Sequence, residues 1–403
     1  MDDEQRRHLE ELRRGHQRRL HQLERQQATF GVSTAPEISI EIEDIRTAIA
    51  RIDTDLKRYI PTVTVVIEPG LASGRPEAIS KLELAIRDAP SGAILRLSPG
   101  IYDLGNRPLV IDKPLTLVGA GMDETLLIGT GERYVAYFSG TGPFIVATLS
   151  FEHQGQQWAH VVEITGGVID VQQCRFVGGV LDKKRGGSGL CLSGETTGVV
   201  IGCEAIRNML SGIQVQEQAQ PTLGANICHK NQTCGIFYRG SASGIARQNT
   251  CTGNGSGIAV VEQAQPMIGA NTCCENTYSG IEYFNSACGV ARQNTCTGNG
   301  TAGINVQGQA QPMLEANICT GNAYNGILVQ GQAQPTLEAN ACHKNTYSGI
   351  RYIDSAGGVV RSNQCSSNGV SGIYIASTAC PTIILDNRCQ GNSGEEIDDQ
   401  RKG

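Results

Sequence analysis

A short motif recurs at nearly constant spacing through the second half of the chain. The pair Gly-Ile is found at eight positions between residues 212 and 373 that follow one another at steps of 22 or 23 residues. A constant period in this range indicates a solenoid, in which each repeat forms one coil that packs on its neighbours. The repeat therefore limits the fold to an elongated array. The pairs begin at Gly212, Gly235, Gly257, Gly280, Gly303, Gly326, Gly349 and Gly372.

Three further rows of residues keep the same period. Two asparagine rows begin at Asn208 and Asn226, and a cysteine row begins at Cys228. Equivalent residues of successive coils in a parallel array stack about 4.7–4.9 Å apart. We expect the cysteines to fill one wall of the core as small apolar side chains, and the asparagines to bond backbone groups at the bends. Asparagine and glycine should also supply the left-handed backbone conformation that sharp corners need.

Two solenoid classes have a period of 22–23 residues. Leucine-rich repeats need a fixed leucine pattern, and leucine is scarce in these repeats. Apolar residues instead alternate with variable ones, as they do in strands. The predicted fold is therefore mainly β, a right-handed parallel β-helix of about twelve coils over residues 61–403. We expect irregular capping coils at 61–185, regular repeats at 186–392 and a tail at 393–403.

Residues 1–60 differ in composition from the rest of the chain. The chain has 33 Lys and Arg plus 39 Asp and Glu, which makes 72 charged residues; residues 1–60 hold 23 of these but only two of the 50 glycines. Leu9, Leu12, Leu20 and Leu23 have helical spacing, and a heptad pattern of isoleucines follows over residues 38–52. We expect a helical hairpin or coiled coil that binds a protein partner or self-associates. A hairpin that only caps the array is the alternative.

Two segments resemble known families. Residues 20–52, LHQLERQQATFGVSTAPEISIEIEDIRTAIARI, resemble a helical segment that precedes effector domains in bacterial signalling and conflict proteins. Residues 84–121, LAIRDAPSGAILRLSPGIYDLGNRPLVIDKPLTLVGAG, are similar to the first coils of pectin-esterase-like and other right-handed β-helix proteins. The later coils resemble the repeat shared by carbohydrate-binding proteins and sugar hydrolases. The resemblance implies this fold over residues 61–392 but no single activity, because the fold carries lyases, hydrolases, epimerases, esterases and binding proteins.

Composition also bears on location and ligands. No window of about 18 apolar residues exists, and the charged start MDDEQRRHLEELRR lacks the apolar core of a secretory signal. Fifteen cysteines without such a signal indicate a reducing compartment. We therefore expect a cytoplasmic protein, and the resemblance of residues 20–52 implies a bacterial one. A net charge of -6 without a basic patch predicts no nucleic-acid or membrane binding, and no residues have metal-ligand spacing, so we expect no metal or cofactor.

One face of the predicted coils carries large side chains. The second and fourth residues after each repeated glycine should point to solvent, because side chains alternate along a strand. Contiguous apolar groups on such a face often mark a partner site, although single exposed apolar residues are ordinary. The predicted partner-binding residues are Phe237, Arg239, Glu282, Phe284, Leu328, Arg351, Ile353 and Tyr374.

The regular repeat is interrupted between residues 151 and 189. This segment contains the only tryptophan, two histidines and the charged insertion LDKKRGG at 181–187. Insertions in repeat arrays lie on one face and often carry function. A sugar ring could stack on Trp158 while a basic side chain contacts a carboxylate; an ordinary solvated loop is the alternative. The candidate catalytic residues in this hypothesis are His153, His160, Asp182, Lys183 and Arg185.

Two hypotheses about function follow. No paired carboxylates or catalytic motif of a polysaccharide enzyme is recognisable in the regular repeats. The first hypothesis is therefore a non-catalytic cytoplasmic scaffold, whose hairpin docks and whose sheet faces bind a protein or an extended ligand such as a carbohydrate. The second hypothesis is a polysaccharide lyase, epimerase or hydrolase that uses residues 151–189.

Overall fold

The computed structural model divides the chain into two compact units, Met1–Thr64 and Val65–Gly403. None of the helices among the described residues is long and apolar enough to cross a membrane. The described residues are 3–30, 42, 45–46, 48–49, 52–53, 64–69, 80–183, 185–383 and 386–402.

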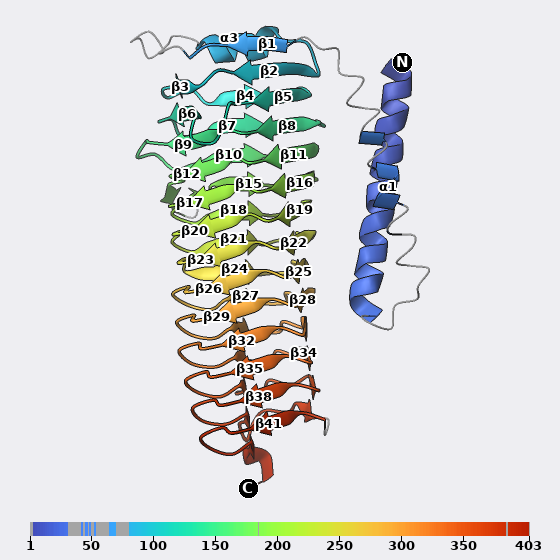
Figure 1. The fold of residues 1–403 in the computed structure, drawn as a ribbon, viewed down its shortest axis with the longest axis vertical. Coiled ribbons are helices and arrows are strands. Elements are labelled where there is room, and N and C mark those ends of the chain that lie inside the picture. Colours follow the sequence, from blue (N-terminus) through green and yellow to red (C-terminus); the bar gives the residue numbers. More distant parts are fainter. Residues whose placement is uncertain are drawn as a thin grey trace. The chain divides into compact units, whose positions relative to one another are not determined.

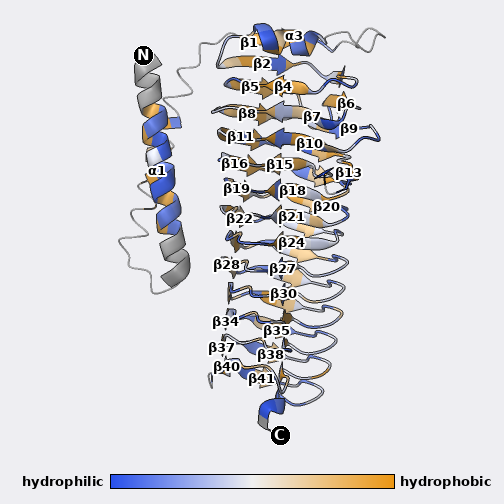
Figure 2. Ribbon diagram, turned by 180° about the vertical axis from the view of Figure 1, so that it is seen from behind, coloured by the Kyte–Doolittle hydropathy of each residue, from blue (hydrophilic) through white to orange (hydrophobic). Residues whose placement is uncertain are grey.

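The first unit is built on one long helix. Helix α1 (Asp3–Phe30) is mostly hydrophilic, as Figure 2 shows, with a narrow apolar stripe. Leu20 and Leu23 on this stripe pack against a group of isoleucines from the helical pieces at 42–53, and Arg46 forms an ion pair with Glu24 at 2.7 Å. Of the predicted second helix of the hairpin, only residues 42, 45–46, 48–49 and 52–53 are described, and the other residues of 31–60 lie outside the described residues. The docking role of residues 1–60 stays a prediction.

The second unit is a parallel β-helix of about thirteen coils. Three parallel sheets run along it, and the described residues contribute 14, 13 and 13 strands to them (Figure 1). Each coil adds one strand to each sheet, so every strand pairs with the strands of the coils before and after it. The regular steps of 22 or 23 residues in the sequence are the lengths of single coils.

The first sheet contains the repeated Gly-Ile pairs, and we call it the glycine–isoleucine sheet. Gly235 and Ile236 both face the interior: Ile236 is fully buried, and a Cβ atom on Gly235 would lie 2.8 Å from Sγ of Cys251. Two consecutive inward residues form a bulge. Glycine at the first of these positions leaves room for the strand that carries Cys251. The strands are β4 (Leu109–Ile111), β7 (Arg133–Phe138), β10 (Ala159–Ile164), β15 (Leu190–Leu192), β18 (Ser211–Val215), β21 (Cys234–Tyr238), β24 (Ser256–Val260), β27 (Ile281–Tyr283), β30 (Ile304–Val306), β33 (Ile327–Val329), β36 (Ile350–Tyr352), β39 (Ile373–Ile375) and β42 (Ile397–Asp399).

The second sheet, called the cysteine sheet, carries the cysteine row on its inner face. Cys228 pairs in register with Cys251, and both thiols are fully buried. The row therefore packs as a stack of small apolar groups, as predicted. The strands are β3 (Gly100–Asp103), β6 (Thr125–Gly129), β9 (Ser150–His153), β12 (Arg175–Val177), β17 (Glu204–Ile206), β20 (Ile227–His229), β23 (Thr250–Thr252), β26 (Thr272–Cys274), β29 (Thr295–Thr297), β32 (Ile318–Thr320), β35 (Ala341–His343), β38 (Gln364–Ser366) and β41 (Arg388–Gln390).

The third sheet closes the coil and extends to the N-terminal end of the unit. Its inner row holds buried apolar residues such as Leu223 and Leu314. The strands are β1 (Thr64–Ile67), β2 (Ala93–Leu97), β5 (Leu115–Val118), β8 (Phe144–Ala147), β11 (Val168–Gln172), β16 (Thr197–Ile201), β19 (Gln220–Gly224), β22 (Ile245–Arg247), β25 (Met267–Gly269), β28 (Val290–Arg292), β31 (Met313–Glu315), β34 (Thr336–Glu338), β37 (Val359–Arg361) and β40 (Thr382–Ile383).

The two asparagine rows lie in the bends on either side of the cysteine sheet. Asn226 donates from Nδ2 to the carbonyl oxygen of Val200 and to Oδ1 of Asn249, and the pattern continues along the row. The residue before this asparagine, Ala225, adopts the left-handed conformation, with a φ of 51°. The expectation that the asparagines themselves take that conformation is therefore wrong for this row: their side chains are used to bond neighbouring coils.

A short helix covers the N-terminal end of the core. Helix α3 (Lys81–Asp88) begins after Ser80, whose hydroxyl accepts a hydrogen bond from the N–H of Glu83, and it buries Leu82 and Ile86. The residues that precede Ser80, from 70 to 79, lie outside the described residues. Figure 1 shows α3 and β1 at the end of the coils. At the other end lies the short 3-10 helix η2 (Gln400–Lys402).

Candidate active site

A group of titratable side chains lies on the outer face of the glycine–isoleucine sheet, near its N-terminal end. On β10, Val161 and Val162 are consecutive residues of the core. The Val161-Val162 pair points inward in the same way as the Gly-Ile pair of the regular coils. The residues that flank it, His160 and Glu163, therefore lie on the outer face. The same holds one coil earlier, where a core pair on β7 separates Tyr134 from Tyr137. The rings of Tyr134 and Tyr137 stack with centroids 4.7 Å apart.

Glu163 is the central carboxyl group of this face. It lies opposite Tyr137 on one neighbouring strand and opposite Cys191 on the other. Burial raises the pKa of the Glu163 carboxyl, the negative charge of Glu217 raises it further, and the charge of Arg133 partly offsets both. A carboxyl group held in this way keeps its proton to a higher pH than an exposed one.

Small polar side chains form the floor beside Glu163. The hydroxyl of Ser188 donates to Oε1 of Gln214 at 2.8 Å, and Nε2 of Gln214 donates to Gln216 at 2.7 Å. Burial raises the pKa of the Cys191 thiol, and the charges of Glu163 and Glu217 raise it further. Tyr137, Glu163 and Glu217 were not identified from the sequence. Tyr137 and Glu163 could have been found from the pattern of their strands, in which two outward residues flank an inward apolar pair. In these two strands the pair lacks the glycine that marks it in the regular repeats.

His160 is held in one orientation and one charge state. Its Nδ1 accepts a hydrogen bond from the backbone N–H of Ser188 at 3.3 Å, so in the neutral ring the proton is on Nε2. The side chain is 9% exposed, and burial lowers the pKa of His160 to about 4. At neutral pH His160 is therefore an uncharged hydrogen-bond donor.

The predicted insertion forms a small antiparallel hairpin of β13 (Leu181–Asp182) and β14 (Arg185–Gly186). Val180, just before the hairpin, exchanges two backbone hydrogen bonds with Ala159. The guanidinium carbon of Arg185 lies 4.8 Å from the centre of the Trp158 ring, and Arg185 also pairs with Asp182 at 3.5 Å. Lys183 is exposed beside them. Four of the residues predicted from the sequence, Trp158, Asp182, Lys183 and Arg185, thus lie together next to His160.

His153 does not join this group. It ends strand β9 of the cysteine sheet, is 4% exposed, and its Nε2 bonds to the carbonyl oxygen of Gly131 at 2.9 Å. A buried ring bonded to backbone supports the bend between two sheets. The structure therefore separates His153 from the other candidate catalytic residues.

The residues predicted to bind a partner lie in two rows farther along the same face. One row is in register on the strands and contains Phe237, Glu282, Leu328, Arg351 and Tyr374. The second row, two residues later in each coil, contains Arg239, Phe284 and Ile353. All eight side chains are half-buried. Their partner-binding role stays a prediction.

Several of these side chains bond one another or their neighbours. Arg351 lies over the ring of Tyr374 at 4.5 Å, and Ser256 donates to Glu282 at 2.8 Å. Arg239 pairs with Glu262 at 3.3 Å. Such contacts hold the charged groups in place and leave parts of the aromatic rings uncovered.

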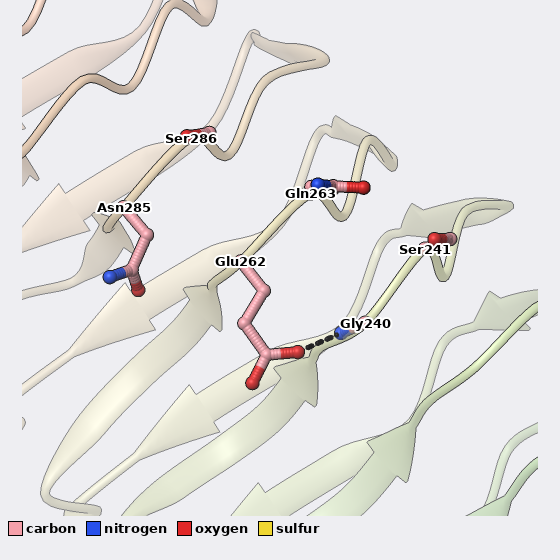
Figure 3. Close-up of a pocket in the computed structure, with 6 residues that line it drawn as sticks. All are labelled: Gly240, Ser241, Glu262, Gln263, Asn285 and Ser286. Atoms are coloured by element: carbon pink, nitrogen blue, oxygen red, sulfur yellow. Dashed lines mark hydrogen bonds between the residues drawn. The ribbon is translucent and has the colours of Figure 1, made fainter.

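A shallow cavity of about 330 Å³ lies in the bend after the glycine–isoleucine sheet (Figure 3). Its carboxylate, Glu262, accepts a hydrogen bond from the N–H of Gly240 at 2.8 Å in addition to its pairing with Arg239. Each of its two oxygens thus has one partner. The cavity also lies away from Glu163 and His160, and we do not place chemistry there. Its lining residues are Gly240, Ser241, Glu262, Gln263, Asn285 and Ser286.

Solved structures with similar folds include polysaccharide epimerases. The periplasmic alginate epimerase AlgG superposes with a TM-score of 0.62 at 15% identity, over 82% of this chain and 83% of that chain. The A-module of the mannuronan C-5 epimerase AlgE6 of Azotobacter vinelandii gives 0.57 at 16% identity, over 79% and 94%. The A-module of AlgE4 from the same organism gives 0.54 at 17% identity, over 80% and 92%.

These similarities correct two expectations from the sequence. The non-catalytic scaffold is contradicted, because the similar solved structures are polysaccharide-active enzymes. The expected cytoplasmic location is contradicted as well, because AlgG is a periplasmic protein. No relative was found among curated proteins. The family model described as right handed beta helix region matches residues 159–273 and 256–400, more than half of the chain. The chain therefore belongs to the right-handed β-helix family.

Proposed function

We propose that this protein is a polysaccharide-active enzyme that transfers protons on a uronic-acid polymer, as a C-5 epimerase or a lyase. The observation that carries the proposal is the carboxyl group of Glu163, whose pKa is raised by burial and by Glu217 on the open face of the sheet. A carboxylate with a raised pKa is a stronger base near neutral pH than an ordinary one. The epimerases with similar folds support the choice of substrate class.

The chemistry needs a base, a cation and a hydrogen-bond donor. In a uronic acid, the proton on C-5 is acidified by the neighbouring carboxylate. Glu163 removes this proton, and the electron pair of the C–H bond moves into the carboxylate. Arg133 supplies positive charge near Glu163 and would pair with that carboxylate. The Nε2–H of His160 and the hydroxyl of Tyr137 are donors on the same face.

Two outcomes follow from the same deprotonated intermediate. In an epimerase, a proton returns to C-5 on the opposite face of the ring. In a lyase, the C-4–O bond breaks, a double bond forms between C-4 and C-5, and the leaving oxygen takes a proton. The half-buried position of Glu163 favours proton transfer of this kind because the carboxyl group titrates closer to neutral pH.

A hydrolase is the second candidate. Glu163 and Glu217 are two carboxyl groups whose charges interact, and their environments differ because Glu163 is half-buried while Glu217 is exposed. Glycoside hydrolysis uses such a pair, one protonated and one ionised. The products separate the candidates: epimerisation inverts C-5, elimination gives an unsaturated sugar, and hydrolysis gives a reducing end without unsaturation.

The test is to incubate the full chain with alginate, polygalacturonate and a neutral glucan. C-5 inversion is followed by proton NMR, with deuterium uptake from heavy water, while ultraviolet absorbance follows unsaturation and a reducing-end assay follows hydrolysis. We expect turnover of a uronate polymer, reduced at least about 100-fold in Glu163→Gln. Glu338→Gln on the third sheet is the matched control and should keep full activity. No product from any polymer, or full activity in Glu163→Gln, would contradict the proposal.

A further inference from the structure

A row of exposed tyrosines runs along the bend that precedes the glycine–isoleucine sheet. Residues at this position are joined coil by coil through backbone hydrogen bonds: the N–H of Thr301 donates to the carbonyl of Tyr278, that of Tyr324 to Thr301, and that of Tyr347 to Tyr324, each at 2.8–2.9 Å. The row is therefore in exact register along the solenoid axis. Its members in successive coils are Gly255, Tyr278, Thr301, Tyr324, Tyr347 and Val370.

Two neighbouring members of the row, Tyr324 and Tyr347, stack on each other. Tyr324 and Tyr347 lie with ring centroids 5.1 Å apart and an interplanar angle of 16°. One face of the Tyr324 ring is thus covered by Tyr347, and the other face is turned toward Thr301, which has no ring. The side chains of Tyr278 and Tyr324 are 56% and 49% exposed.

Thr301 lies between Tyr278 and Tyr324 in the row and has no ring. We call the space that it leaves between these two tyrosines the slot. Tyr278 and Tyr324 belong to coils that are two strand spacings apart, or about 9.5 Å. A flat ring placed midway would lie about 4.8 Å from each side, within the range in which rings stack. The spacing between the Tyr278 and Tyr324 positions therefore has the width for one six-membered ring.

The floor of the slot is polar. The hydroxyls of Thr301 and Ser279 bond each other at 2.7 Å, and Glu282 lies next to Ser279 and accepts a hydrogen bond from Ser256. A ligand that fits must have apolar faces and a polar edge, which describes a sugar ring and excludes an aliphatic side chain. The nearby carboxyl group of Glu282 disfavours an acidic sugar.

We propose that the slot between Tyr278 and Tyr324 binds a neutral sugar ring of a glycan chain. The site is separate from the candidate active site, since four strands of the glycine–isoleucine sheet lie between Glu282 on β27 and Glu163 on β10. It goes beyond the proposed function, because it selects neutral sugars and needs no turnover. A glycan bound here would hold the protein on a polymer that contains both neutral and acidic sugars.

The test uses xylo- and cello-oligosaccharides as neutral probes, with alginate oligosaccharides as the acidic comparison. Binding to the full chain is measured by affinity gel electrophoresis and by saturation-transfer NMR. Thr301→Tyr adds the missing ring and fills the slot. Val370→Tyr adds a ring at the equivalent position beyond Tyr347 and leaves the slot open, so it is the matched control. Thermal denaturation of each variant checks that the fold is retained.

We expect the wild type and Val370→Tyr to bind a neutral oligosaccharide with equal affinity, and Thr301→Tyr to lose binding. Tyr278→Ala and Tyr324→Ala should each weaken binding by up to about tenfold, because each removes the contribution of one stacked ring to the affinity. Unchanged binding in Thr301→Tyr would overturn the proposal, as would absence of binding to any neutral probe. Self-association that is lost only in Thr301→Tyr would assign the slot to a second copy and would also overturn it. None of these results depends on activity at Glu163.

Discussion

The backbone of Ala159 exchanges two hydrogen bonds with Val180, at 2.8 and 3.0 Å, which fixes the inserted hairpin to β10 between the side chains of Trp158 and His160. The hairpin is also anchored at its exit, where the N–H of Ser188 binds His160. The inserted residues therefore do more than interrupt the repeat. They set the position of His160 on the face that carries Glu163.

Tryptophan fluorescence should report on this hairpin alone, because Trp158 is the only tryptophan of the chain. Replacing Arg185 with alanine uncovers the ring, so we expect red-shifted emission in Arg185→Ala. Addition of uronate oligosaccharides should change the emission of the wild type if the hairpin borders the active site. Arg351→Ala removes the equivalent contact with Tyr374 and should leave the emission unchanged. Emission that does not respond to any uronate oligosaccharide would separate the hairpin from the substrate site.

His160 should make the protein less stable in mild acid. Its folded pKa is about 4, against an ordinary value of 6.5. As the pH falls from about 6.5 to about 4, the unfolded chain binds a proton that the folded chain does not, so the free energy of unfolding falls by up to about 3 kcal/mol. His160→Gln lacks this titration. The difference in melting temperature between the two proteins should therefore move in favour of the variant between about pH 7 and about pH 5; a constant difference would show that His160 is charged in the fold.

Glu163 should act on stability in the opposite pH direction. Its folded pKa is raised above the ordinary 4.5, so its contribution to stability is present at low pH and is lost as the pH rises through the folded value. Glu163→Gln should thus gain stability relative to the wild type between about pH 4 and about pH 8. Thermal denaturation at both pH values measures this gain.

Glu204 is the matched comparison for Glu163. Its burial would raise its pKa, but hydrogen bonds and charges of Arg175 and His229 outweigh burial and lower it. The wild type should therefore lose stability relative to Glu204→Gln as the pH falls. Equal slopes for the two variants would contradict the assignment of a raised pKa to Glu163.

The fold could be predicted because each coil repeats the same physical solution. The Gly-Ile pair marks the bulge, the cysteine marks the inner wall, and the asparagine marks the bend, so many copies confirm one reading of the pattern. The position of the left-handed residue could not be read in the same way. Ala225 takes it because the Asn226 side chain must point inward to reach Val200 and Asn249. Sequence alone does not show which of two neighbours turns.

The candidate site was predicted only in part, because it lies where the repeat is least regular. The insertion pointed to Trp158 and Arg185. Glu163 and Tyr137 were missed, because their strands have Val-Val and Val-Ala pairs in place of Gly-Ile. The register that sets Glu163 opposite Tyr137 depends on a coil of 26 residues, which differs from the regular period.

The cysteines should react in three groups. All fifteen lie among the described residues: Cys380 is exposed, three are half-buried and eleven are buried. Burial raises the pKa of thiols such as Cys234 and also blocks access, so buried thiols should not react with Ellman's reagent until the chain unfolds. We expect one fast thiol, up to three slow ones, and eleven that appear only in denaturant. Cys380→Ser should remove the fast phase, and rapid reaction of more than four thiols in the native protein would contradict the buried stack.

The largest loss of stability from a single polar side chain should come from the middle of an asparagine row. Asn294 accepts two hydrogen bonds from Asn271 at 2.9 Å each, and its Nδ2 donates to Asn317 and to the carbonyl oxygen of Ile268. Alanine at this position removes four buried hydrogen bonds, although Asn317 Oδ1 keeps its bond from the backbone N–H of residue 294 and Asn271 Nδ2 keeps its bond to Ala246. Since a buried polar group that loses its partner costs about 1–3 kcal/mol, we expect Asn294→Ala to lower the free energy of unfolding by about 3–5 kcal/mol.

Asn305→Ala is the control for this substitution, because Asn305 is half-buried on the outer face and accepts one hydrogen bond, from Gln330 at 3.2 Å. Its loss should cost less than about 1 kcal/mol. Urea denaturation followed by circular dichroism measures both variants. Each coil of a solenoid is stabilised mainly by its two neighbours, so a break at Asn294 should also split the single unfolding transition into two. A loss in Asn294→Ala no larger than in Asn305→Ala would mean that strand pairing and the apolar core hold the coils together without the asparagine row.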